Sequence, residues 1–264
     1  MSDDNQGTVR LRIADGVASV VFDRPAARNA MTWAMYESLA AICRQLAADP
    51  TVRLATFRGA GSPEGGAFVA GTDIAQFAGF TGGDDGVAYE HRIDAGIGLL
   101  ESLPMPTVAV IDGWTIGGGL AIATACDFRL ATPTSRFGVP IARTLGNCLA
   151  TANLARLEAA FGLQAVRRML LLAEVLDAPQ ALALGYLEQV CEAAELDATA
   201  ARLCERLAAL APVTQAVAKE GLRRVVAQRI AEGDDLVRRC YGSADFREGV
   251  AAFVGKRKPV WQGR

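Results

Sequence analysis

The sequence lacks several features that would assign it to a common functional class. It has a single histidine, and its six cysteines are scattered without a Cys-x-x-Cys pair, which argues against a zinc site or a redox dithiol. A formal net charge of −2 provides no field that would attract nucleic acid or an anionic membrane. The sequence shows neither a secretory signal pattern nor an apolar run of about 18 residues. We therefore expect a cytoplasmic protein with no metal, nucleic-acid or membrane partner.

What the sequence does contain is a hydrophobic fraction of 51%, enough for a large core, and an alternation of strand and helix patterns. Residues 9–13 and 17–22 flank a turn at Asp15-Gly16 and predict a β-hairpin. The patterns that follow predict strands at 52–57, just before Gly71, at 107–111 and at 127–131, a loop at 59–66, and helices at 32–48, 87–103 and 120–126.

After about residue 150 the strand patterns stop and helical patterns take over. Helices are predicted at 150–173, 179–190, 194–210, 213–227 and 246–256. We therefore predict an α/β core at residues 1–195, followed by a helical C-terminal region at residues 196–264.

Two glycine-bearing segments carry the clearest functional signal. Phe68-Val-Ala-Gly-Thr-Asp-Ile74 and Thr115-Ile-Gly-Gly-Gly-Leu120 each join an apolar run to a predicted helix start. Backbone N–H groups at a helix start lack partners within the helix and point outward together. If the two turns converge, these groups form a cradle for a developing oxyanion. A purely structural role for the glycines is the alternative, and the run does not match the Gly-x-Gly-x-x-Gly pattern of dinucleotide-binding folds.

These two segments resemble the paired oxyanion-hole motifs of the crotonase superfamily, the enoyl-CoA hydratase/isomerase family. The resemblance extends over nearly the whole chain, and its other segments are Asp23-Arg-Pro-Ala-Ala-Arg-Asn-Ala-Met31, Cys126-Asp127, Arg136-Phe-Gly-Val-Pro140, Ser243-Ala-Asp-Phe-Arg-Glu-Gly249 and Ala252-Phe-Val-Gly-Lys-Arg257. It implies repeated ββα turns wound into a superhelix, with C-terminal helices that pack subunits into homotrimers or dimers of trimers. It also implies an acyl-CoA substrate, with coenzyme A as part of that substrate and no tightly bound cofactor.

The resemblance assigns roles to individual residues. It places the oxyanion hole at the backbone N–H groups of Thr72 and Gly118. It implies contacts to CoA or to the acyl group at Ala26, Arg28, Ala70, Gly71, Asp73, Gly117, Ala121, Ile141, Phe253 and Lys256. Asp73 is also well explained as a helix cap. Ala75 stands where the family often has a lysine, which removes one expected phosphate contact.

The chain departs from the family at the acid–base positions. Family members that hydrate an enoyl-CoA double bond use two glutamates, and the corresponding residues here are Ala121 and Ile141, which cannot carry a proton. General acid–base catalysis is worth roughly 100- to 10,000-fold in rate. We therefore expect a poor hydratase unless other side chains replace the two glutamates.

Only weak candidates for a replacement acid or base stand out. Glu90, His91 and Asp94 lie on the predicted helix from which some family members send such residues to the pocket, and histidine is the usual proton carrier near neutral pH. The same segment is also typical of a solvated helix face. Arg143 and Asn147 could orient a polar substrate, although arginine is not a practical base.

We therefore expect a crotonase-family enzyme that stabilises the enolate of an acyl-CoA thioester. Double-bond isomerisation, decarboxylation or C–C cleavage is favoured over efficient hydration. The alternative is a non-catalytic acyl-CoA-binding protein, because the same loss of the acid–base pair would produce one. A serine peptidase on the related Clp-type fold is disfavoured, because the sequence lacks a credible Ser/His pair.

Overall fold

The computed structural model describes residues 6–61 and 66–264. The first five residues and residues 62–65 of the predicted 59–66 loop lie outside the described part. The strands form two sheets. The larger has the order β1 (Thr8–Ala14), β2 (Val17–Asp23), β3 (Leu54–Gly59), β5 (Thr107–Ile111), β7 (Phe128–Ala131) and β10 (Gln189–Val190). The smaller has the order β4 (Ala67–Val69), β6 (Trp114–Ile116), β8 (Arg136–Gly138) and β9 (Val175–Asp177).

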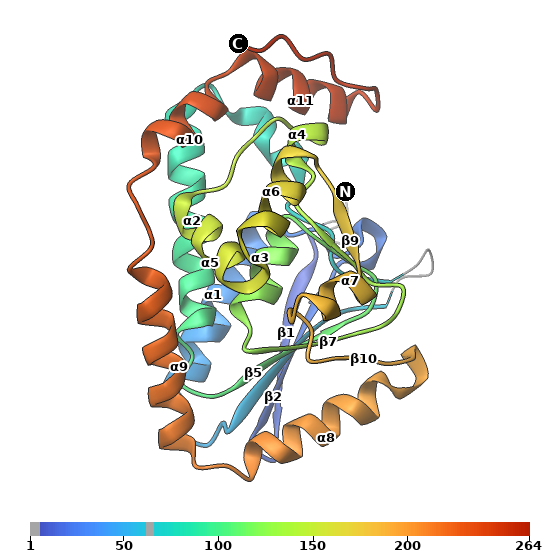
Figure 1. Cartoon of the computed structure of the whole chain (residues 1–264), viewed down its shortest axis with the longest axis vertical. Helices are drawn as coiled ribbons and strands as arrows, with labels where there is room; N and C mark the ends of the chain where they lie inside the picture. Colours follow the sequence, from blue (N-terminus) through green and yellow to red (C-terminus); the bar gives the residue numbers. More distant parts are fainter. Residues whose placement is uncertain (1–5, 62–65) are drawn as a thin grey trace.

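Helices connect and cover these sheets (Figure 1). The α-helices are α1 (Trp33–Ala48), α2 (Gly83–Glu101), α3 (Gly118–Ala125), α4 (Ile141–Thr144), α5 (Thr151–Phe161), α6 (Leu163–Leu171), α7 (Ala178–Ala183), α8 (Leu196–Ala208), α9 (Pro212–Ala227), α10 (Asp234–Tyr241) and α11 (Ala244–Val254). Short 3-10 helices lie at η2 (Pro25–Ala27), η3 (Ile74–Gly79) and η4 (Ala193–Glu195).

The predicted N-terminal hairpin is confirmed. β1 pairs with β2 in antiparallel register up to Ala14 opposite Val17. The two turn residues, Asp15 and Gly16, both have positive φ angles, 51° and 76°. A two-residue turn of this kind matches the twist of the strands, which is why Asp-Gly is a strong hairpin signal. From β2 onward, every pairing in the larger sheet is parallel, as expected for strands joined by helical crossovers.

The central strand β5 shows how the core is divided. All five of its residues are buried, because both faces of a parallel sheet are covered. Ala109 and Ile111 face the cluster that includes α1 and α3, whereas Val108 and Val110 pack with α8 on the other face. The cluster on that face includes Leu196, Leu203 and Leu207 of α8, and burying each such side chain contributes about 1.5–3 kcal/mol. The boundary predicted at residue 195 stays a prediction.

The prediction that strands stop near residue 150 was wrong. β9 and β10 follow that point, and the sequence analysis also missed β6 and β8. These strands have only two or three residues each, too few to show a period-2 pattern, and their pairing partners alone define them. The predicted helix 179–190 was too long, because α7 ends at Ala183. The predicted helix 150–173 is two helices, interrupted at Gly162, where φ is 76°.

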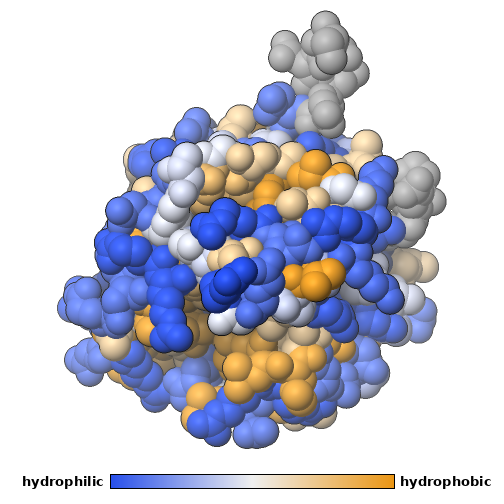
Figure 2. Space-filling model, turned by 90° about the horizontal axis from the view of Figure 1, so that it is seen from above, coloured by the Kyte–Doolittle hydropathy of each residue, from blue (hydrophilic) through white to orange (hydrophobic). Residues whose placement is uncertain are grey.

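The C-terminal helices differ in how deeply they are buried. α10 packs against α2, and α11 packs against η3. Every residue of α9 is at least partly exposed, including the side chain of Val217 at 67%, and in Figure 1 this helix forms an outer edge of the molecule. Seen from the end that carries α11, the surface is mainly hydrophilic with hydrophobic patches between charged side chains (Figure 2). None of the described helices combines the length and apolar character needed to span a membrane.

Candidate active site

Two neighbouring parallel strands bring the glycine-bearing turns together. β4 pairs with β6, with Ala67 opposite Trp114 and Val69 opposite Thr115. The carboxyl ends of paired parallel strands lie at one edge of a sheet, so the turns that follow β4 and β6 must be neighbours. Both turns need glycine: φ is 103° at Gly71 and 53° at Gly117, in the region that side-chain-bearing residues rarely adopt. The convergence expected from the sequence is therefore observed.

The N–H groups of Thr72 and Gly118 are unpartnered where the turns meet. The flanking amides are used, since Asp73 N–H donates to Met31 O at 2.9 Å and Gly117 N–H to Gly138 O at 3.0 Å. For Thr72 and Gly118, by contrast, no backbone or side-chain acceptor is found within the described residues. The two residues are close together, because a Cβ atom added to Gly118 would lie 3.1 Å from Thr72 Oγ1. Both residues line one cavity, and unpartnered backbone donors in such a place can bind a developing negative charge.

The side chain of Thr72 is already engaged by two tyrosines. Its Oγ1 lies 2.8 Å from the hydroxyl of Tyr36 and 3.1 Å from that of Tyr89. Burial raises the pKa of Tyr36 to about 12, so its phenol stays protonated over the physiological range. This network fixes the rotamer of Thr72 and leaves its backbone N–H as the group available to a ligand.

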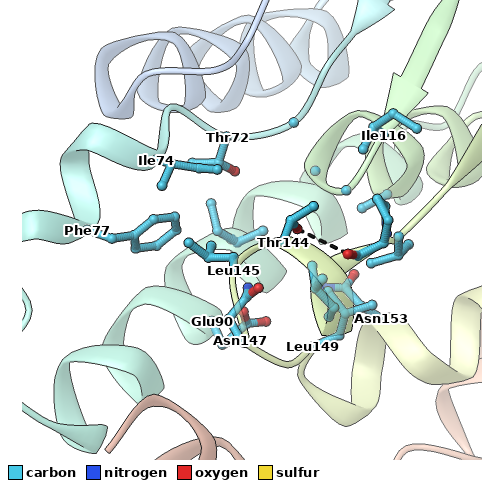
Figure 3. A pocket seen from close by; sticks show the side chains of 18 of the residues that line it. Thr72, Ile74, Phe77, Glu90, Ile116, Thr144, Leu145, Asn147, Leu149 and Asn153 are labelled. Carbon is cyan, nitrogen blue, oxygen red and sulfur yellow. Dashed lines mark hydrogen bonds between the residues drawn. The ribbon is translucent and has the colours of Figure 1, made fainter. Parts of the chain in front are cut away.

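A cavity of about 210 Å³ lies in front of these amides (Figure 3). In this view Thr72 and Ile116 lie along one side, whereas Glu90, Asn147 and Asn153 lie on the other. Most of the lining is apolar, with contributions from Ile74, Phe77, Ile93, Ile116, Ala121, Val139, Ile141, Leu145, Leu149 and Leu157. None of the described residues that line it is an arginine, lysine or histidine. The cavity thus suits an acyl chain.

Glu90 is the one carboxylate among the described lining residues, and it is only 2% exposed. Its Oε1 accepts a hydrogen bond from Tyr241 Oη at 2.7 Å, and its Oε2 accepts one from Ala150 N–H at 2.9 Å. Burial raises the pKa of Glu90 to about 7, and the two hydrogen bonds offset part of that rise. A carboxyl group of this kind can both take up and release a proton near neutral pH.

The other acid–base candidates lie elsewhere. His91 follows Glu90 on α2, but its side chain is 62% exposed and its Nε2 pairs with Asp234 at 2.8 Å. Asp94 pairs with Arg156, and Arg143 is exposed on α4. None of these three side chains lines the cavity. By contrast, Ala121 and Ile141 both line it; that they stand at the positions of the two family glutamates stays a prediction.

Comparison with known proteins agrees with this geometry. The family model of enoyl-CoA hydratase/isomerase matches residues 12–264 of the chain. The chain belongs to the enoyl-CoA hydratase/isomerase family. An enoyl-CoA isomerase/hydratase of Mycosarcoma maydis is 30% identical over 94% of this chain and 93% of its own length. Carnitinyl-CoA dehydratase of Proteus mirabilis is 31% identical over 97% of this chain and 99% of its own length.

A solved structure shows the same fold. Methylmalonyl-CoA decarboxylase in complex with 2-nitronate-propionyl-CoA superimposes with a TM-score of 0.87 at 27% identity, over 97% of this chain and 98% of the other. The crotonase fold inferred from the motifs is therefore confirmed. The neighbour is bound to an acyl-CoA analogue. For this enoyl-CoA hydratase/isomerase family member, the location in the cytoplasm and the oligomeric state stay predictions.

The residues expected to contact CoA fall into two groups. Ala70, Gly71, Gly117, Ala121, Ile141 and Phe253 line the cavity. Phe253 reaches it from α11 although its side chain is half exposed. Ala26, Arg28 and Lys256 are exposed and do not line it. Asp73 caps η3 through a 3.2 Å bond from Ala75 N–H and pairs with Arg24 at 2.9 Å, so its expected capping role is confirmed.

Sequence analysis missed three polar residues that line or support the site. Asn29 is fully buried at a φ of 58°, and its amide donates to Ala60 O and Ala67 O, so it anchors the segment 23–31 to β4, the strand before Gly71. Tyr241 and Asn153 had no recognisable signal. For Glu90 a signal was available, because helical spacing from the buried Ile93 places it on the same face.

Proposed function

We propose that this chain is an acyl-CoA isomerase that moves a double bond relative to the thioester carbonyl. Glu90 would take a proton from the α-carbon of a 3-enoyl-CoA and return it to the γ-carbon, so that the double bond moves from C3–C4 to C2–C3. The N–H groups of Thr72 and Gly118 would bind the thioester oxygen while it carries the charge of the intermediate dienolate. One observation carries this proposal: a single cavity holds two adjacent unpartnered amides and one carboxyl group whose pKa is raised to about 7.

The absence of carboxylates at positions 121 and 141 separates this function from hydration. Adding water requires one group that deprotonates the water and a proton source at the α-carbon. The described lining residues include one carboxyl group, that of Glu90. The side chains at positions 121 and 141, Ala121 and Ile141, are hydrocarbon and cannot transfer a proton. A single acid–base residue suffices for isomerisation, because the proton that it removes is the proton that it returns.

Decarboxylation is a second candidate, supported by the TM-score of 0.87 to methylmalonyl-CoA decarboxylase. In that reaction CO₂ leaves with cleavage of a C–C bond, and the bonding electrons pass into the enolate that the two amides stabilise. The protonated form of Glu90 would then supply the proton to the α-carbon. No base is needed to start the reaction, which again fits the apolar residues at 121 and 141.

The remaining proposals concern CoA and assembly. Arg28 and Lys256 are exposed and cationic, so we assign them to the phosphates of CoA. We assign α9 to a homotrimer or dimer-of-trimers contact, because its exposed side chains include Val213, Val217 and Val225 at helical spacing.

A substrate panel tests the proposal. Purified protein would be incubated with 3-hexenoyl-CoA, crotonyl-CoA and methylmalonyl-CoA, and products would be separated by chromatography. We expect conversion of 3-hexenoyl-CoA to the 2-enoyl isomer, with a Glu90→Gln variant as the matched control. Rapid hydration of crotonyl-CoA would contradict the proposal. Binding of all three thioesters by calorimetry without turnover would favour the non-catalytic acyl-CoA-binding alternative.

A further inference from the structure

Two cysteines that are far apart in the sequence come together behind the cavity. Cys148 lies between α4 and α5, next to Asn147, and Cys240 precedes Tyr241 on α10. The two segments are joined by hydrogen bonds. Cys240 Sγ donates to Gly146 O at 3.2 Å, and Asn147 Nδ2 donates to Tyr241 Oη at 3.2 Å. The fold therefore forms a cysteine pair that no short spacing in the sequence indicates.

The two thiols also interact directly. Their hydrogen bond lowers the pKa of Cys240 and raises the pKa of Cys148, as expected when the Cys148 thiol donates to the Cys240 sulfur. The thiolate is the reactive form of cysteine, so the thiol with the lowered pKa is the one that an oxidant attacks first. Cys240 is therefore the reactive thiol, and Cys148 lies in place to form a disulfide with it.

Exposure distinguishes this pair from the other cysteines. Cys148 and Cys240 are partly exposed, whereas the remaining four are buried: Cys43, Cys126, Cys191 and Cys204. Burial raises the pKa of Cys126 to about 12, which keeps its thiol protonated. Buried thiols in apolar surroundings react slowly with oxidants. We therefore expect oxidation to be confined to the pair.

The two cysteine segments are also the segments that hold Glu90. Tyr241, the residue after Cys240, donates to Glu90 Oε1 at 2.7 Å. The N–H of Ala150, two residues after Cys148, donates to Glu90 Oε2 at 2.9 Å. A covalent bond between the cysteines would join the two segments from which these hydrogen bonds come. The oxidation state of the pair is thus coupled to the position of the carboxyl group.

We propose that Cys148 and Cys240 are oxidised by peroxide to a reversible disulfide that lowers turnover at Glu90. The Cys240 thiolate attacks one peroxide oxygen, the O–O bond breaks, and the departing hydroxide takes up a proton to become water. The Cys148 sulfur then attacks the resulting sulfenic acid, the S–O bond breaks, and a second water leaves with the Cys148 proton. Two thiols are oxidised while one hydrogen peroxide is reduced to two waters. A dithiol reductant reverses the reaction by thiol–disulfide exchange.

The bond would change the geometry of the site. An S–S bond is about 2.05 Å long, much shorter than the contact distance of two unbonded sulfur atoms, so the residue 146–150 segment and α10 must move toward each other. The two donors to Glu90 move with these segments. A displacement of about 1 Å can cost roughly 100-fold in rate. The effect on turnover rests on the proposed function, whereas formation of the disulfide does not.

Peroxide treatment of the intact protein tests both parts. Trypsin cleaves after arginine, so Cys148 lies in the peptide 144–156 and Cys240 in the peptide 240–247. In the oxidised wild type we expect mass spectrometry to find these two peptides linked. Turnover of 3-hexenoyl-CoA should fall about 10- to 100-fold and should return with dithiothreitol. Cys148→Ser should keep its turnover during the same treatment. Cys191→Ser, which removes a buried cysteine, is the matched control and should respond as the wild type does.

The outcomes separate this inference from the proposed function. If peroxide leaves the two wild-type peptides unlinked, the disulfide is excluded. Linked protein with unchanged turnover would exclude the effect on Glu90, and so would a loss of turnover that persists in Cys148→Ser. If the reduced protein converts none of the thioesters in the substrate panel, the proposed function fails, while linked peptides would still establish the disulfide. The wild-type peptide map decides this even if Cys148→Ser does not fold.

Discussion

Replacing Glu90 with glutamine removes a titrating proton from the cavity with little change of shape. One amide oxygen can still accept from Tyr241 or from the Ala150 N–H, but not from both, which costs stability at every pH. The pH-dependent part of the change in unfolding free energy is separate from this cost. At position 90 only a carboxyl group can couple folding to proton binding, so the difference in unfolding free energy between wild type and Glu90→Gln, followed against pH, isolates its contribution.

The magnitude follows from the pKa. Burial raises the pKa of Glu90 from 4.5 to about 7, so the folded state binds this proton more tightly than the unfolded state does. Stability from this group is therefore fully present below pH 4.5 and is lost as pH rises to about 7. The loss amounts to about 3 kcal/mol, because each pH unit in that interval is worth 1.36 kcal/mol.

Urea unfolding at pH 5 and at pH 8 measures this loss. Between pH 5 and pH 8 we expect the unfolding free energy of the wild type to fall by about 2–3 kcal/mol more than that of Glu90→Gln. In the isomerase assay, kcat/KM of the wild type should change near pH 7, and Glu90→Gln should reduce kcat by roughly 100- to 10,000-fold. An equal stability difference at both pH values would refute the raised pKa. A pH–rate inflection that persists in the variant would assign the acid–base role to another group.

Three further perturbations test the site and the assembly. Gly118→Ala places a Cβ 2.3 Å from Tyr36 Oη, so we expect turnover to fall about 100-fold as the amide cradle shifts; unchanged turnover would argue against that cradle. Asn29→Ala removes the three hydrogen bonds that the side chain makes to backbone groups, and we expect a loss of about 2–4 kcal/mol in urea unfolding; a loss below about 1 kcal/mol would show that water replaces the side chain. If α9 forms the proposed subunit contact, Val217→Asp should lower the sedimentation coefficient of the wild-type assembly in sedimentation velocity, and an unchanged coefficient would exclude α9 from the contact.

The local signals in the sequence were sufficient for much of the fold. The Asp15-Gly16 turn was recognised because positive φ angles demand such residues, and β5 because a fully buried strand is continuously apolar. β6 and β8 were missed because strands of three residues carry too little pattern. They exist only through pairing with neighbours, and that pairing places the two glycine turns side by side.

The sequence alone determined where the glycine turns lie, and it predicted both the oxyanion-holding amides and the loss of the family's glutamates at Ala121 and Ile141. Only the tertiary structure decided which side chains face the cavity. Glu90 and His91 are adjacent in sequence, yet successive residues on a helix point about 100° apart. Glu90 therefore faces the cavity, where burial raises its pKa, while His91 faces solvent and pairs with Asp234. Asn147 likewise donates a hydrogen bond to Tyr241, which is 94 residues away in the sequence, and only folding brings their side chains together.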